Sequence, residues 1–320
     1  MIEEVYELYE HYRFVVPEGQ SLVRIDRYLT YKIQNSTRHK VQIGIEKGYV
    51  LVNDLPVKNN YRVKPNDVIK IKLPEKVKDK THYPENMNLN ILYEDDFLLI
   101  INKPAGIVVH PTFNNYEGTL YNGLLYHFEK NLHSEKPYIV HRIDKDTSGI
   151  LIVAKDIETM KNLAQQFFYH SVKRTYYALV WGKLENKSGT IKTFLDRSKK
   201  DRKLVQVYKN EGKEAITHYE VIQEYNFFSL IKCNLETGRT HQIRVHLSHL
   251  GNPIFNDSFY GGDVIPKEYA NFLNEDIFYI LQRHALHSKD IIFYHPVLKK
   301  NIFVESELPD DFKNMISMLD

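Results

Sequence analysis

Residues 141–155 read HRIDKDTSGILIVAK, and this stretch carries the strongest structural signal in the chain. Its second half is a continuous apolar run, which is typical of a strand buried on both faces. Its first half places His141, Arg142 and Asp144 directly in front of that strand. A carboxylate there is partly desolvated and needs a cation to remain ionised. Asp144 is therefore a candidate for chemistry, and a local ion pair with Arg142 or Lys145 is the simpler interpretation.

The segments around this strand alternate between strand-like and helix-like patterns. NILYEDDFLLIINKP (90–104) indicates two strands around an acidic turn, and IETMKNLAQQFF (157–168) has apolar residues at helical spacing. Strand-like runs follow over 174–237, several with alternating apolar and polar residues. This order predicts an α+β fold with a mixed, mostly antiparallel sheet flanked by helices over residues 91–320. No GxGxxG or GxxxxGK[ST] motif indicates a dinucleotide or P-loop site.

The stretch GRTHQIRVHLSHLG predicts a short helix over 241–250. Thr240 suits its N-cap, and Gly251 suits the position after its last turn. His241 and Arg244 lie near the helix start, on a face next to the buried stripe. An arginine fixed at this place could hold a carboxylate by a two-pronged contact. The histidines form no i, i+4 pair with an acidic third ligand, so we expect no metal site.

The net charge of +2 hides an uneven distribution along the chain. Residues 1–20 sum to −4, residues 21–80 to +8, and residues 81–320 to −2. A basic module of this kind attracts phosphate groups, although lysine-rich segments also simply solvate a surface. LPEKVKDKTHYPENMNLN (73–90) has no apolar periodicity and is typical of a linker. We therefore expect an acidic leader at 1–20, a basic module at 21–75, a linker at 76–90 and a larger domain at 91–320.

The basic module has the pattern of two amphipathic helices followed by short strands. Its sequences RIDRYL, STRHKVQIGIEKGYVLVN and YRVKPNDVIKI resemble the ribosomal-protein-S-four-type RNA-binding domain, a small α/β fold. In that family the second helix and its leading loop lie on RNA phosphates. The resemblance therefore implies that Arg38 and Lys40 bind RNA, with Lys47 behind them.

Residues 90–310 resemble the RluA-type family of RNA pseudouridine synthases. Matching motifs occur in the family's order: NKPAGIVVHP, HRIDKDTSGILIVAK, RTYYALVWG, GRTHQIRVHL, GNPIFND and RHALHS. The resemblance implies that Asp144 is the catalytic aspartate, that Tyr176 stacks on the target uracil, and that Arg244 pairs with the aspartate. The candidate substrate contacts beside them are His141, Arg142, Ile143 and Ile243. The family's Gly-Asp after GNPI reads Asn256-Asp257 here, which we expect to touch no catalytic position.

The implied reaction moves the ribose bond of a uridine from N1 to C5 of the uracil. It changes no composition, so we expect neither a cofactor nor a metal. The residues leave open whether the aspartate attacks the sugar, attacks the ring or promotes a glycal, and whether Tyr176 or a water removes the C5 proton. The target uridine has to be flipped out of a stem or already unpaired.

The implied partner is RNA, and the N-terminal module favours large-subunit ribosomal RNA over transfer RNA. A second hypothesis is a catalytically silent RNA-binding factor for ribosome assembly, and a third is a glycosidase that uses Asp144 with Asp146. The single cysteine, the acidic start and the lack of a long apolar run predict a cytoplasmic protein without a membrane segment. We expect it to be a monomer.

Overall fold

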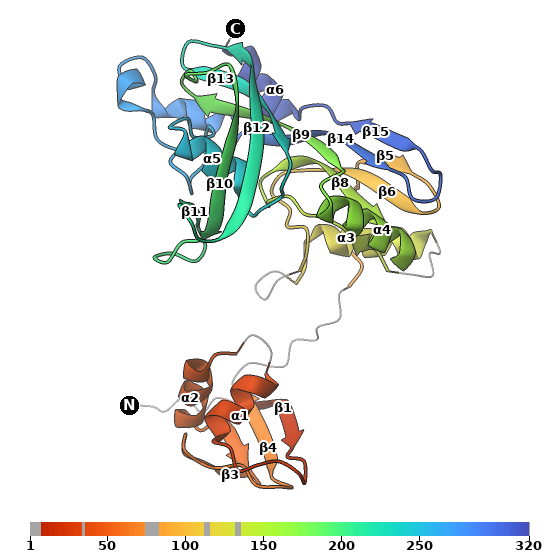
Figure 1. Cartoon of the computed structure of the whole chain (residues 1–320), viewed down its shortest axis with the longest axis vertical. Coiled ribbons are helices and arrows are strands. Elements are labelled where there is room, and N and C mark those ends of the chain that lie inside the picture. Colours follow the sequence, from red (N-terminus) through yellow and green to blue (C-terminus); the bar gives the residue numbers. More distant parts are fainter. Residues whose placement is uncertain (1–7, 34–35, 74–82, 112–115, 132–135, 320) are drawn as a thin grey trace. The chain divides into compact units, whose positions relative to one another are not determined.

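The computed structural model describes residues 8–33, 36–73, 83–111, 116–131 and 136–319 (Figure 1). The chain divides into two compact units, Met1–Thr81 and His82–Asp320. Among the described residues, no helix combines the length and the apolar character that a membrane crossing requires. Each unit has its own hydrophobic core.

The N-terminal unit combines two helices with an antiparallel four-stranded sheet. Its elements are β1 (Tyr9–Val15), α1 (Ile25–Lys32), α2 (Arg38–Glu46), β2 (Val50–Val52), β3 (Leu55–Pro56) and β4 (Val68–Leu73), with the strand order β1-β4-β2-β3. The Thr37 side chain accepts a hydrogen bond from the backbone N–H of Lys40 at the start of α2. Gly48 follows α2 with a φ of 72°, a backbone conformation that favours glycine.

Strand β1 corrects the assignment of residues 1–20 to a separate leader. Residues 9–15 pair with β4 along its length, from Tyr9 opposite Leu73 to Val15 opposite Val68. Tyr12 and Phe14 pack against the core of the unit. In this strand Glu10 is exposed, whereas Tyr12 and Phe14 are partly buried, so a summed charge does not reveal the strand pattern.

The predicted linker at 76–90 also differs from the structure. Residues 76–82 lie outside the described residues, and residues 83–90 belong to the larger unit. The Asn122 side chain donates to the carbonyl of Tyr83 at 2.8 Å, and Leu89 packs against the main core. The polar composition of residues 83–90 therefore indicates a linker wrongly, because backbone hydrogen bonds such as Glu85 N–H to the Asn122 carbonyl fix this segment to the larger unit.

The larger unit is built on one sheet of eleven strands. Its main path is β11 (Val205–Tyr208), β10 (Ser188–Arg197), β12 (Lys213–Glu224), β13 (Phe228–Leu235), β9 (Lys173–Trp181), β14 (Leu286–Tyr294), β8 (Ser148–Ala154), β6 (Leu98–Lys103) and β5 (Ile91–Glu94). β15 (Asn301–Glu305) pairs with β14, and β7 (Tyr138–Ile139) pairs with β8. Among the strand pairs of the described residues, β14 with β8 is the one parallel pair. The predicted α+β fold with a mixed, mostly antiparallel sheet is confirmed.

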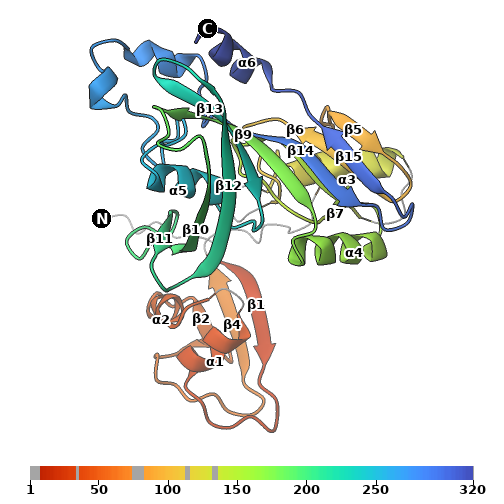
Figure 2. The same cartoon turned by 45° about the horizontal axis from the view of Figure 1, so that its top comes forward.

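Helices cover this sheet and position the segments between its strands. They are α3 (Leu120–Lys130), α4 (Ile157–Phe168), α5 (Gln242–His249) and α6 (Asp310–Ser317), with short 3-10 helices η1 (Lys267–Tyr269) and η2 (Glu275–Tyr279). Helix α4 lies beside β7 and β8, and α5 lies beside β11 and β12 (Figure 1 and Figure 2). The loop before β8, strand β9 and the start of α5 supply the lining of one cavity.

The TSG sequence at 147–149 is explained by the parallel contact of β8 with β14. Ser148 and Gly149 lie opposite His287 and Ser288. A Cβ atom on Gly149 would lie 2.2 Å from the Ser288 carbonyl oxygen, and Gly149 has a φ of +109°. Only glycine allows this approach and this backbone conformation together. The loop that carries Asp144 is thereby fixed directly against the start of the buried strand.

Candidate active site

A cavity of about 470 Å³ contains every candidate residue predicted in the larger domain. Its volume falls in the range of small-ligand sites. The candidates that line it are His141, Arg142, Ile143, Asp144, Tyr176, Ile243 and Arg244. They come from the loop before β8, from strand β9 and from helix α5, so the fold brings together residues as far apart in the sequence as His141 and Arg244.

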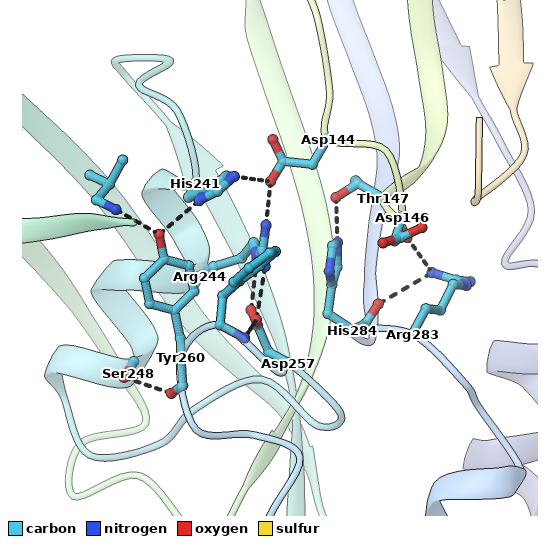
Figure 3. Close-up of polar contacts among 12 residues, drawn as sticks. Asp144, Asp146, Thr147, His241, Arg244, Ser248, Asp257, Tyr260, Arg283 and His284 are labelled. Atoms are coloured by element: carbon cyan, nitrogen blue, oxygen red, sulfur yellow. Dashed lines mark hydrogen bonds and ion pairs between the residues drawn. The ribbon is translucent and has the colours of Figure 1, made fainter. Parts of the chain in front are cut away.

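Asp144 and Arg244 form an ion pair at the centre of this cavity (Figure 3). Arg244 Nη1 donates to Asp144 Oδ2 at 2.9 Å. The Asp144 side chain is 21% exposed, so a ligand in the cavity can reach it, whereas the Arg244 side chain is only 4% exposed. The long-range pair with Arg244 replaces the simpler local interpretation, in which Asp144 would pair with a sequence neighbour.

The two-pronged contact of Arg244 is made with Asp257 and not with Asp144. Arg244 Nε donates to Asp257 Oδ2 at 2.7 Å, and Nη2 donates to Oδ1 at 2.8 Å. Both side chains are buried. The expectation that Asn256-Asp257 touches no catalytic position is therefore wrong, because Asp257 holds the arginine that contacts Asp144. Arg244 lies between two carboxylates, and the pair with Asp257 fixes its orientation.

The surroundings of Arg244 favour its charged form. Burial opposes that form, but the hydrogen bonds and charge of Asp257, with a further contribution from Asp144, raise the pKa of Arg244 well above its ordinary value. The guanidinium carbon also lies 5.4 Å from the ring centre of Phe259 and 5.2 Å from that of Tyr260. These aromatic faces attract a cation and leave little freedom for the side chain to turn.

His141 and His241 occupy different places at the edge of the cavity. His241 precedes α5 with a φ of 55°, so it, and not Thr240, is the N-cap residue. One of its ring nitrogens, Nδ1, lies 2.7 Å from the Tyr260 hydroxyl oxygen, and the other, Nε2, lies 3.8 Å from Asp144 Oδ2. Burial lowers the pKa of His241, an effect that the nearby Asp144 carboxylate opposes.

His141 is half-buried, and its neutral ring accepts a hydrogen bond. Its Nε2 accepts the backbone N–H of Ile152 at 3.0 Å, and its ring stacks on Phe167 with 4.7 Å between centres. Burial, together with the charge of Arg174, lowers the pKa of His141 to about 3. His141 therefore fixes the loop to β8 and has no charge of its own near neutral pH. Its neighbour Arg142 is exposed at the rim of the cavity.

Tyr176 and two isoleucines supply the apolar part of the cavity. Tyr176 is only 6% exposed, Ile143 6% and Ile243 4%. Burial raises the pKa of Tyr176, so its phenol stays protonated at neutral pH. A flat protonated ring beside apolar side chains is suited to hold an aromatic base by stacking.

Residues that the sequence analysis left without a role fix the loop around Asp144. The Thr147 hydroxyl lies 2.8 Å from His284 Nε2, and Arg283 Nη1 donates to the Asp146 carbonyl at 3.2 Å (Figure 3). Lys103 Nζ donates to the Lys145 carbonyl at 2.9 Å and to two further carbonyls, those of Pro104 and Ile107. The motifs NKPAG and RHALHS contain three of these residues, Lys103, Arg283 and His284, but motif matching alone assigns them no contact.

The basic module presents its three candidate RNA ligands at the surface. Lys40 is exposed on α2, and Lys47 is exposed directly after its last residue. Arg38 is half-exposed and pairs with the buried carboxylate of Asp26 at 3.0 Å, so only part of its guanidinium faces solvent. Burial opposes the charge of Asp26, but hydrogen bonds from Arg24, Gln42 and Arg38 lower its pKa to about 2.

In the described part of the chain, no group of three or more His, Cys, Asp or Glu side chains is arranged to hold a metal ion. The one cysteine, Cys233, is buried in the main core. The polar chemistry of the cavity therefore rests on carboxylates, arginines, histidines and a tyrosine.

A single accessible carboxylate, held by a buried arginine beside an aromatic ring, defines a site for chemistry on a ring-containing substrate. Two family models match the chain: RNA pseudouridylate synthase over residues 97–249 and S4 domain over residues 23–69. An "Uncharacterized RNA pseudouridine synthase" of Chlorobaculum parvum is 42% identical over 95% of this chain and 96% of its own length. A "Ribosomal large subunit pseudouridine synthase D" of Nitrosomonas europaea is 39% identical over 95% of this chain and 86% of its own length.

A solved structure shares the fold of the larger unit. The human protein "RNA Pseudouridylate Synthase Domain Containing 4" aligns with a TM-score of 0.57 at 24% identity, over 72% of this chain and 92% of that one. The chain belongs to the RNA pseudouridine synthase family and carries an S4 domain at its N-terminal end. It is an isomerase that converts uridine in RNA to pseudouridine.

Proposed function

We propose that Asp144 is the nucleophile of this isomerisation and that large-subunit ribosomal RNA is its substrate. In the reaction the bond from N1 of uracil to the ribose C1′ breaks and a bond from C5 to C1′ forms. C5 loses a proton and N1 gains one, so the composition is unchanged. A nucleophile near the anomeric carbon divides this exchange into two easier steps.

The observation that carries the assignment is the asymmetric surroundings of Asp144. Its side chain is 21% exposed to the cavity, while its partner Arg244 is buried and held from behind by Asp257. In the Asp144–Arg244–Asp257 triad, the Asp144 carboxylate is therefore accessible, and the Asp257 carboxylate is buried and supports Arg244. Arg244 satisfies one oxygen of Asp144 and leaves the rest of the carboxylate facing the cavity.

We assign to Tyr176 the stacking of the uracil ring and not the removal of its C5 proton. Burial raises the pKa of this phenol, which keeps it protonated and unsuited to accept a proton at neutral pH. The proton passes instead to a water molecule. Ile143 and Ile243 enclose the detached base while it turns.

The ribosomal substrate is supported by the name of the Nitrosomonas relative and by the S4 domain. The exposed Lys40 in α2 and Lys47 directly after it supply charge that attracts phosphates, independently of base sequence. Transfer RNA is the second candidate substrate.

The test is incubation of the purified protein with RNA transcripts made without modifications: large-subunit ribosomal RNA, small-subunit ribosomal RNA and transfer RNA. Pseudouridine is then mapped in each. We expect it in the large-subunit transcript alone. Product in the transfer RNA alone, or in none of the three transcripts, would refute the ribosomal assignment.

A further inference from the structure

Arg174 on strand β9 is a buried cation to which the described part of the chain supplies no counter-ion. It is 7% exposed, and its Nε atom has no hydrogen-bond partner. No carboxylate or carbonyl among the described residues accepts a hydrogen bond from its guanidinium. Burial lowers the pKa of Arg174, because no nearby carboxylate among the described residues stabilises its charged form. Arg244, the other buried arginine of the cavity, has two carboxylate partners.

The unpartnered guanidinium faces the active-site cavity. Arg174 and Tyr176 both line it, as expected for residues two positions apart on one face of a strand. The guanidinium carbon lies 5.4 Å from the ring centre of Phe167, which also stacks on His141. Because His141 is neutral, it offers Arg174 no compensating charge.

The loop after β13 leaves space for this guanidinium. A Cβ atom on Gly238 would lie 2.8 Å from Arg174 Nη1. Gly238 is also part of the cavity lining, as are two further cations at the rim, Arg142 and Arg239. This wall of the cavity is positive, whereas the Asp144–Arg244–Asp257 triad carries one net negative charge.

An unpaired buried charge is costly, and the cost is removed when an anion enters. The guanidinium matches phosphate oxygens by two-pronged hydrogen bonds and keeps its charge in a buried site. We propose that Arg174 binds a phosphate of the RNA next to the target uridine, and that this contact orients the nucleotide with its ribose toward Asp144. The proposal rests on the enzyme's action on RNA and is independent of which RNA is modified.

The test compares Arg174→Met with Lys173→Met in the full-length protein. Lys173 is the exposed sequence neighbour of Arg174, so both variants lose one positive charge from the same strand. The readouts are the affinity for a transcript that the wild type modifies, its dependence on salt, and the melting temperature.

We expect Arg174→Met to weaken RNA binding roughly ten- to a hundredfold, the effect of one charge-assisted hydrogen-bonded contact. The slope of log affinity against log salt concentration falls by about one relative to wild type. The melting temperature stays the same or rises, because an unpaired buried charge has been removed. Lys173→Met leaves all three nearly unchanged.

Gly238→Ala is a second variant, which displaces the flexible end of Arg174 and keeps its charge. We expect it to raise KM with little change in kcat. An unchanged affinity and salt slope in Arg174→Met would overturn the proposal. So would a lower kcat with an unchanged salt slope, which would assign Arg174 to the uracil ring, or a lower melting temperature with unchanged RNA affinity, which would make its role structural.

Discussion

Asp257→Asn tests whether the buried carboxylate behind Arg244 positions the catalytic pair. The substitution keeps the shape of the side chain but replaces one acceptor oxygen by an NH₂ group, which cannot accept from the guanidinium. One of the two hydrogen bonds, at 2.7 and 2.8 Å, is therefore lost together with the charge. Asp257 is 1% exposed and cannot itself touch a substrate in the cavity.

The size of the effect follows from burial. Breaking a buried ion pair costs about 3–5 kcal/mol, and the lower figure applies because Asp144 still pairs with Arg244. For a unit of this size, a loss of about 3 kcal/mol lowers the melting temperature by roughly 6–12 °C. Displacement of Asp144 by about 1 Å reduces kcat by roughly a hundredfold. KM changes little, since the binding walls of the cavity are intact.

The assay is pseudouridine formation on an unmodified transcript, with the melting temperature measured in parallel. Asp95→Asn is the matched control. Asp95 Oδ2 accepts a hydrogen bond from the Tyr93 hydroxyl at 2.7 Å and lies 2.9 Å from His295 Nε2. An NH₂ group in place of this oxygen disrupts both contacts, so the variant destabilises the fold without changing the cavity lining. An Asp257→Asn enzyme with an unchanged kcat would refute the positioning role, even if its melting temperature falls.

Three further predictions concern other parts of the chain. The stability that Asp26 gives to the N-terminal unit is present above its unfolded pKa of about 4 and is lost as the pH falls through about 2. Between pH 5 and pH 2, calorimetry of Asp26→Asn should therefore show a smaller fall in the melting temperature of this unit than wild type, and an equal fall would contradict the sign. Lys40→Gln with Lys47→Gln should reduce the salt slope of RNA binding by roughly one per contact, while the exposed Lys199→Gln, as control, should not. Gly149→Ala should lower the melting temperature strongly, because its Cβ would lie 2.2 Å from the Ser288 carbonyl, and normal stability would show that β8 and β14 can separate.

The sequence predicts those elements of the fold whose signal is local. The apolar run at 150–154 lies within the fully buried strand β8, and the helix expected at 241–250 is found at Gln242–His249. The summed charge of residues 1–20 does not reveal strand β1, because a sum over twenty residues hides the alternation of side chains between the two faces of a strand. The predicted N-cap, Thr240, lies one residue too early. His241 adopts a left-handed backbone conformation directly before α5 and occupies the N-cap position itself.

The candidate site could be predicted only in part, since motif order identifies residue types but not their partners. Asp257 was missed because its turn is placed by tertiary contacts, such as Trp181 Nε1 donating to the Gly262 carbonyl at 2.8 Å. The available signal was an aspartate in the GNPIFND motif, close in sequence to the arginine that it pairs with. The sequence does not predict a special role for Arg174, because its lack of a partner among the described residues can be seen only in the folded structure.

The most direct test of the central claim compares Asp144→Asn with Asp146→Asn on a transcript that the wild type modifies. Arg244 stays fixed by Asp257, so Asp144→Asn should fold and bind RNA as the wild type does. The contact of Asp146 with Arg283 uses its backbone carbonyl, which the control variant keeps. We predict that Asp144→Asn forms no pseudouridine above background, while Asp146→Asn forms it at the wild-type rate. Pseudouridine formation by Asp144→Asn at the wild-type rate would contradict the account.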